Sequence, residues 1–194
     1  MTEPSVDVHQ PTREEAWELV QESTPSESLR RHMRSVEAAM RAYAVRFGED
    51  PDRWGVLGLI HDWDYESGPT PEEHPVRGIG MLRERGWPED LLEDIASHAD
   101  YLDVPRDTPV RRALYAVDEM SGFVIACALV KSRSLSAVDA RTVRKKMKDK
   151  AFARGVNREH LQAGADELGV DFDEHVAVVR DALVPIAAEL GLEP

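Results

Sequence analysis

Cysteine is nearly absent from this sequence. Cys127 is the one cysteine in 194 residues, so no disulfide can form within a chain, and thiolate-rich zinc sites are excluded. Long apolar runs are also missing, and no segment approaches the roughly 20 apolar residues of a transmembrane helix. The first four residues, Met1 to Pro4, lack the layout of a signal peptide. These absences predict a cytoplasmic protein in which histidine and carboxylate side chains hold any metal ion.

Basic residues are outnumbered by acidic ones. The chain has 24 Lys and Arg against 37 Asp and Glu, which gives a formal charge of −13. An acidic surface repels nucleic acid phosphates and anionic membranes, so we expect neither as a partner. Residues 141–154 differ, with seven basic side chains and one acidic side chain. This segment is either a solvated helix face, the commoner case, or a site for substrate phosphate. The sequence leaves homo-oligomerisation open.

Period-two alternation of polar and apolar residues is rare, whereas apolar residues three and four apart recur along the chain. The pattern predicts an all-α fold, a single-domain bundle of about eight or nine helices. We expect residues 1–11 to form a flexible tail and residues 12–194 to form one helical domain. Predicted helices begin at Thr12, Ser26, Asp50, His74 (reaching Arg85), Pro88 (carrying His98), Pro109 (reaching Val130), Asn157 and Asp171.

Several polar side chains lie where the helical pattern points toward the core. The apolar run from Gly58 ends in the adjacent pair His61 and Asp62, and Asp118 lies in the most apolar predicted helix. A buried carboxylate is costly without a cation or several hydrogen bonds. Three more histidines fall on inward faces or at helix ends: His32, His74 and His98.

The remaining three histidines have simpler interpretations. His9 and His160 have polar neighbours and are predicted to be solvated. His175 shares the apolar side of the last helix, and we predict a core histidine that is satisfied by a hydrogen bond.

A divalent cation would resolve the burial of all the inward-facing polar groups together. Imidazole and carboxylate ligands suit iron, manganese, cobalt, nickel or zinc. Six ligands are too many for one catalytic ion with an open position, but they match two ions that share a bridging carboxylate. The predicted metal ligands are His32, His61, Asp62, His74, His98 and Asp118.

The order of these six residues resembles the HD-domain superfamily of metal-dependent phosphohydrolases, and more narrowly its HDIG-type members. The resemblance covers about residues 29–130, and the remainder is similar to bacterial members of the same group. It implies a first ion held by His32, His61, Asp62 and Asp118, and a second ion held by Asp62, His74 and His98.

The chain departs from two patterns of that superfamily. Trp63 and Asp64 follow the His-Asp pair, where the HDIG pattern has Ile-Gly. Tyr65 stands where the cyclic-di-nucleotide phosphodiesterases of the superfamily have a lysine. The resemblance therefore does not extend to a cyclic-di-nucleotide substrate.

The resemblance implies hydrolysis of a phosphoester in a small phosphorylated molecule, for instance a nucleotide, with Asp62 central to catalysis. Asp64 and Glu66 are candidates for proton transfer or for supporting the ligands, with ordinary loop acids as the alternative. Arg106 and Lys131 are candidates for binding substrate phosphate. The diiron oxygenases of the superfamily, which act on small organic substrates through a mixed-valent iron pair, have a similar ligand set and form the alternative function. A binding module with a vestigial site is disfavoured because no ligand position is lost.

Overall fold

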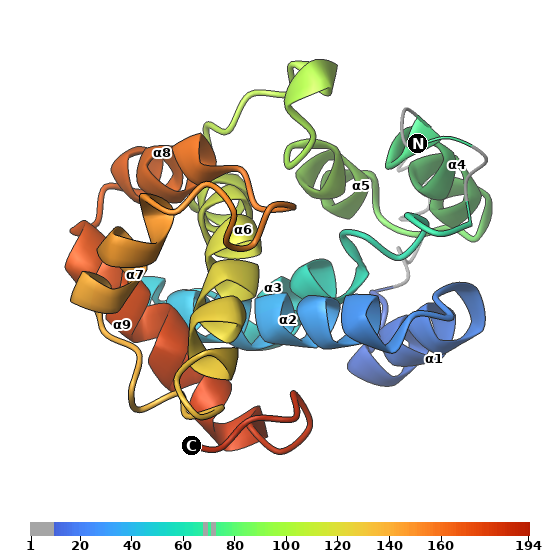
Figure 1. The fold of residues 1–194 in the computed structure, drawn as a ribbon. Coiled ribbons are helices and arrows are strands. Elements are labelled where there is room, and N and C mark those ends of the chain that lie inside the picture. Colours follow the sequence, from blue (N-terminus) through green and yellow to red (C-terminus); the bar gives the residue numbers. More distant parts are fainter. Residues whose placement is uncertain (1–9, 68–69, 71–72) are drawn as a thin grey trace, which may run out of the picture.

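The computed structural model describes residues 10–67, 70 and 73–194. Within these residues the chain forms nine α-helices and two short 3-10 helices, and it contains no β-strand, only one isolated bridge between Ser134 and Glu193 (Figure 1). The predicted all-α architecture is therefore confirmed. The predicted tail lies outside the described residues, except for Gln10 and Pro11. His9 lies outside them as well.

The starts of most helices follow from side-chain caps. An N-cap oxygen accepts a backbone N–H of the first turn at five of the predicted helix starts: Thr12, Ser26, Asp50, Asn157 and Asp171. The α-helices are α1 (Arg13–Ser23), α2 (Glu27–Phe47), α3 (Pro51–Ile60), α4 (Val76–Glu84), α5 (Glu89–Ala96), α6 (Pro109–Leu129), α7 (Ala140–Met147), α8 (Arg158–Leu168) and α9 (Phe172–Leu183), and the 3-10 helices are η2 (Asp100–Leu102) and η3 (Val184–Ile186).

Two helices near the predicted metal ligands are shorter than the sequence pattern predicted. Helix α4 begins at Val76, not at His74, because a residue before proline is disfavoured in helical conformation. Helix α5 ends at Ala96, so the prediction that His98 lies within it is wrong. The Ser97 hydroxyl donates a hydrogen bond to the Asp94 carbonyl at 2.7 Å, and such a bond competes with continuation of the helix. Both histidines consequently lie in turns at helix ends.

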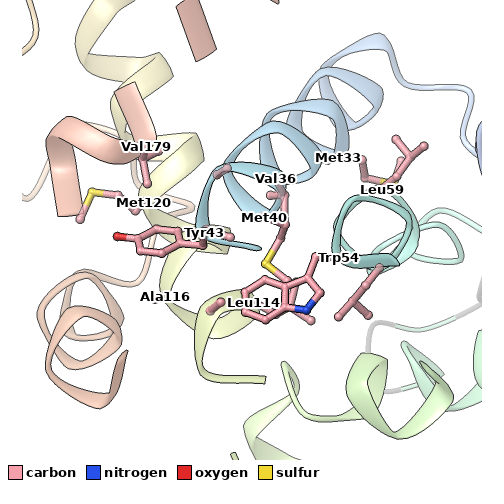
Figure 2. Close-up of a cluster of buried hydrophobic side chains, with 14 of the residues drawn as sticks. Met33, Val36, Met40, Tyr43, Trp54, Leu59, Leu114, Ala116, Met120 and Val179 are labelled. Carbon is pink, nitrogen blue, oxygen red and sulfur yellow. The ribbon is translucent and has the colours of Figure 1, made fainter. Parts of the chain in front are cut away.

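Helices α2 and α3 pack against each other along the centre of the bundle. Met33 and Met40 of α2 lie beside Leu59 and Trp54 of α3 in the buried cluster of Figure 2. A Cβ atom at Gly58 would lie 3.0 Å from the backbone of α2, so the glycine permits this close approach.

Helix α6 crosses α2 and separates two groups of helices. In Figure 1, α7, α8 and α9 gather on one side of α6, and α4 and α5 lie on the other. Gly164 of α8 lies against α6 so closely that a Cβ atom would be 2.7 Å from the Ala116 Cα. The crossing brings the middle of α6 toward the ends of α3 and α5, where the predicted ligands lie.

None of the described helices combines the length with the apolar character that crossing a bilayer requires.

Candidate metal centre

The six predicted metal ligands come from five separate parts of the chain. His32 lies on α2, His61 and Asp62 directly follow α3, His74 lies in the turn before α4, His98 follows α5, and Asp118 lies on α6. The imidazole rings contact one another in the order His32, His61, His98 and His74, with successive centroids 5.1–5.3 Å apart. The structure therefore brings together all six residues.

Asp62 lies between two groups of histidines, and its two oxygens face different groups. Its Oδ2 atom lies 3.7 Å from Nε2 of His32 and 3.5 Å from Nε2 of His61. Its Oδ1 atom lies 3.0 Å from Nε2 of His74 and 3.5 Å from Nε2 of His98. In each group the ligand atoms lie within 4.8 Å of one another, so each group could hold a metal ion. A carboxylate in this position has the geometry of a bridging ligand.

Asp118 adds a second carboxylate to the first group. Its Oδ1 atom lies 3.0 Å from Nε2 of His32 and 3.5 Å from Nε2 of His61. The first group thus offers two imidazoles and two carboxylates, and the second offers two imidazoles and the shared carboxylate of Asp62.

Three of the histidines are held so that Nε2 faces the centre. Nδ1 of His61 donates a hydrogen bond to the Gly58 carbonyl at 2.8 Å, and Nδ1 of His98 donates one to the Ile95 carbonyl at 2.5 Å. A carbonyl can only accept, so Nδ1 carries a proton, and Nε2 offers a lone pair to a metal ion when the ring is neutral. This arrangement is typical of metal-ligating histidines.

Asp64 orients the third of these histidines. Its Oδ1 atom accepts a hydrogen bond from Nδ1 of His74 at 2.6 Å, and its Oδ2 atom accepts one from the Gly78 backbone N–H at 2.7 Å. The Asp64 side chain is buried, and a Cβ atom at position 78 would lie 2.5 Å from its carboxylate carbon. Asp64 is therefore a positioning residue for His74, the supporting role that the sequence suggested beside proton transfer.

The chemistry of these donors fits a cation. Nε2 of His61 is fully buried and has no hydrogen-bond partner among the described residues, and its nearest carboxylate oxygens are 3.5 Å away. Nε2 of His74 and Nε2 of His98 lie 3.1 Å apart, and Nδ1 carries a proton on both rings. In the neutral rings the two facing lone pairs repel each other unless a proton or a metal ion lies between them. The residues present thus match two adjacent divalent ions bound by imidazole and carboxylate.

The electrostatics of the cluster also favour positive charge. Burial lowers the pKa of His61, but the charges of Asp62 and Asp118 outweigh burial and raise this pKa to about 9. Burial likewise lowers the pKa of His74, and hydrogen bonds to Asp62 and Asp64 raise it to about 9. Burial opposes ionisation of Asp62, yet the neighbouring histidines hold its pKa well below the usual range. Carboxylates that favour protonated imidazoles will also favour a metal ion.

A pocket of about 440 Å³ opens onto the cluster. This volume lies within the range of small-molecule sites. Five of the six candidate ligands line the pocket, and His61 lies behind them, fully buried. The other described lining residues are Leu29, Tyr65, Ala99, Tyr101, Glu119, Gly122, Gly155 and Val156.

Glu119 is a pocket residue that the sequence analysis missed. It lines the pocket beside Asp118, and burial together with the charge of Asp118 raises its pKa to about 7. A residue next to a core-facing position is normally turned about 100° away from it on a helix. Position alone therefore gave no signal for Glu119, although Asp118, Glu119 and Gly122 of α6 all line the pocket.

The other predicted site residues lie outside the described lining of the pocket. Glu66 accepts a hydrogen bond from the Ser26 backbone N–H at 2.9 Å. Arg106 pairs with Asp100 and Glu167 at 2.8 Å each. Lys131 is exposed just beyond the end of α6. In the segment 141–154, the basic side chains lie on and after α7, and none of them lines the pocket. Roles for these residues in catalysis or in substrate binding stay predictions.

Two histidines lie away from the cluster. His175 is fully buried, and its ring nitrogens bond to Tyr43 and to the Ala116 carbonyl, so the prediction of a satisfied core histidine is confirmed. His160 is half-buried rather than solvated. It packs against Tyr115, and its Nε2 atom lies 3.1 Å from Asp100.

Asp64→Asn is expected to weaken the binding of one ion and leave the other unchanged. An asparagine side chain has one acceptor oxygen, so it cannot serve both Nδ1 of His74 and the Gly78 N–H. Loss of such an orienting partner typically costs 10–100-fold in metal affinity, and we expect a loss of that order for the ion beside His74. Calorimetric titration with Mn²⁺ or Zn²⁺ measures the two affinities. Glu66→Gln, in the same turn but outside the pocket lining, is the matched control and should match the wild type. Unchanged affinities in Asp64→Asn would contradict the positioning role.

Comparisons of this chain with family models, with curated proteins and with solved structures found no match.

Proposed function

We propose that this chain is a metal-dependent phosphohydrolase of the HD type, which hydrolyses a phosphoester of a small molecule. The observation that carries the proposal is the position of Asp62, whose two oxygens face two separate histidine groups beside a pocket. Paired divalent ions in such a site supply an activated water and neutralise the charge of the phosphate group.

The side chains of the chain would have distinct roles in this reaction. His32, His61 and Asp118 would hold one ion, and His74 and His98 would hold the other, with Asp62 shared between them. Asp64 would fix the ring of His74 through its Nδ1 atom. The pocket would admit a molecule of small to moderate size, because its volume is about 440 Å³.

The proposal is tested by metal analysis together with phosphate release. The purified chain, loaded in turn with Mn²⁺, Co²⁺, Ni²⁺, Zn²⁺ or Fe²⁺, is incubated with a panel of phosphate monoesters, diesters and nucleotides. We expect about two ions per chain and phosphate release that is lost in Asp118→Asn. His160→Gln removes a histidine outside the cluster and is the control that should retain activity.

Two outcomes would contradict the proposal. One is a chain that binds two ions but releases no phosphate from any member of the panel. The other is a redox-active iron pair that consumes oxygen with an organic substrate and is inert toward phosphoesters. The second outcome would establish the oxygenase alternative.

A further inference from the structure

Two tyrosines with exposed rings line the pocket beside the metal cluster. Tyr65 is 51% exposed and Tyr101 is 56% exposed, so each presents a large aromatic surface to the solvent. The two tyrosines are far apart in the sequence, and the fold brings them to one pocket. Exposed apolar groups that gather at a pocket often mark a binding surface.

Both tyrosines contact His74, one of the candidate metal ligands. The ring of Tyr65 makes an edge-to-face contact with the ring of His74, with centroids 5.3 Å apart. The hydroxyl of Tyr101 donates a hydrogen bond to the backbone carbonyl of His74. The backbone of Tyr65 is also fixed, since its N–H donates to the Asp62 carbonyl at 3.0 Å. The two rings therefore have defined positions on the side of the second histidine group.

The pocket offers few other means of recognising an anionic ester. No Lys or Arg is among the described residues that line it, and three lining residues are acidic: Asp62, Asp118 and Glu119. Among these described residues, no permanently cationic side chain faces the phosphoryl oxygens, so the ions would hold them. The remaining wall is apolar or small, with Leu29 and Val156 as its larger members. Discrimination between esters must then come from contacts with the organic part of the molecule.

We propose that the tyrosine pair, Tyr65 and Tyr101, binds the organic part of the substrate as a planar aromatic ring. The substrate class would be a phosphoester whose phosphate lies at the ions and whose ring stacks on the tyrosines. This inference rests on the proposed function, because it uses the ions to hold the phosphate. Stacking of a ring on an aromatic side chain is worth about 1–3 kcal/mol, which corresponds to roughly 5–150-fold in affinity.

Binding of phosphonates to the metal-loaded chain tests the inference. Phosphonates are not hydrolysed as esters, so differences between leaving groups do not enter. Benzylphosphonate presents a planar ring, cyclohexylmethylphosphonate presents a ring of similar size that is not planar, and methylphosphonate presents none. Titration calorimetry gives the affinities, and saturation-transfer NMR shows whether the ring protons contact the protein. We expect benzylphosphonate to bind at least about tenfold more tightly than the other two.

Variants of the tyrosines separate stacking from structural effects. Tyr65→Leu keeps an apolar side chain but removes the planar face, and it should abolish the preference for benzylphosphonate. Tyr65→Phe should retain the preference, and the metal content of both variants should match the wild type. Tyr101→Phe keeps the ring and removes the hydroxyl that donates to the His74 carbonyl.

Each outcome of this experiment has a defined meaning. Equal binding of benzylphosphonate and cyclohexylmethylphosphonate, or an unchanged preference in Tyr65→Leu, would overturn the inference. Phosphoester hydrolysis without any ring preference would overturn the inference and leave the proposed function standing. A ring preference that depends on Tyr65, in a chain that hydrolyses no phosphoester, would support the inference and reject the proposed function.

Discussion

Asp62→Ala is expected to lose both metal ions, whereas His98→Ala is expected to lose only one. The reason is the placement of the two Asp62 oxygens, with Oδ2 facing His32 and His61 and Oδ1 facing His74 and His98. Removing this carboxylate takes one ligand from each group and also removes a negative charge from beside both. Removing His98 takes a ligand from one group only.

The expected size of the effect is large. Loss of a group behind a metal ligand typically costs 10–100-fold in affinity, so loss of a shared ligand should cost each ion more than about 100-fold. Metal content per chain after dialysis against limiting Mn²⁺ or Zn²⁺ measures the result, by inductively coupled plasma mass spectrometry. Circular dichroism should show the same helix content in all proteins. His160→Ala is the control, because His160 lies outside the cluster, and it should keep both ions.

Two results would contradict the bridging role of Asp62 between two separate metal sites. If Asp62→Ala keeps one ion at full occupancy, Asp62 belongs to one group and does not bridge. If Asp62→Ala and His98→Ala lose the same number of ions, the two groups do not act as separate sites.

Much of the fold could be predicted because its signals are local. The caps at Thr12, Ser26 and Asp50 act within one helical turn, so a short stretch of sequence contains all the groups involved. The six candidate ligands were also visible, because a histidine or carboxylate on an apolar helix face or at the end of a helix is conspicuous. Their convergence needed only that these faces meet in one core.

The wall of the pocket could not be predicted in the same way. Tyr101 reaches His74 across 27 positions of the chain, and its hydrogen bond depends on where η2 lies relative to α4. Gly155 and Val156 line the pocket because the turn before α8 passes beside α6, and neither residue has a chemical feature that marks it. Asp64 was identified as a candidate, but its role followed from the approach of Gly78. Residues that shape a site through distant contacts leave little trace in the sequence.

The buried histidine on α9 gives the second large prediction, which concerns stability rather than metal binding. His175 is fully buried, and the hydroxyl of Tyr43 of α2 donates a hydrogen bond to Nδ1 of His175 at 2.6 Å. Nε2 of His175 donates to the Ala116 carbonyl of α6 at 3.0 Å. Both nitrogens are thus satisfied in the neutral ring, and three helices are joined through it. A second proton would have to sit on Nδ1, where the hydrogen bond with Tyr43 would have to reverse its direction.

Burial lowers the pKa of His175 to about 4, despite the opposing hydrogen bond to Ala116. The pKa of this ring is near 6.5 in the unfolded chain and about 4 in the folded chain. Between these values the unfolded state holds more protons, so the free energy of unfolding falls as the pH falls. The slope is about 1.4 kcal/mol per pH unit at most, which gives a loss of roughly 2 kcal/mol between pH 6.5 and pH 5.

Urea unfolding at a series of pH values, with a chelator present to remove metal effects, measures this loss. His175→Gln removes the titrating ring, and its glutamine carbonyl can still accept from Tyr43. We expect this variant to be less stable than the wild type at pH 7 by about 1–3 kcal/mol, because the packing and the bond to Ala116 are disturbed. The difference should shrink by roughly 2 kcal/mol toward pH 5, since only the wild type pays for keeping His175 neutral. A constant difference between His175→Gln and the wild type from pH 7 to pH 5 would show that His175 titrates alike in the folded and unfolded chains.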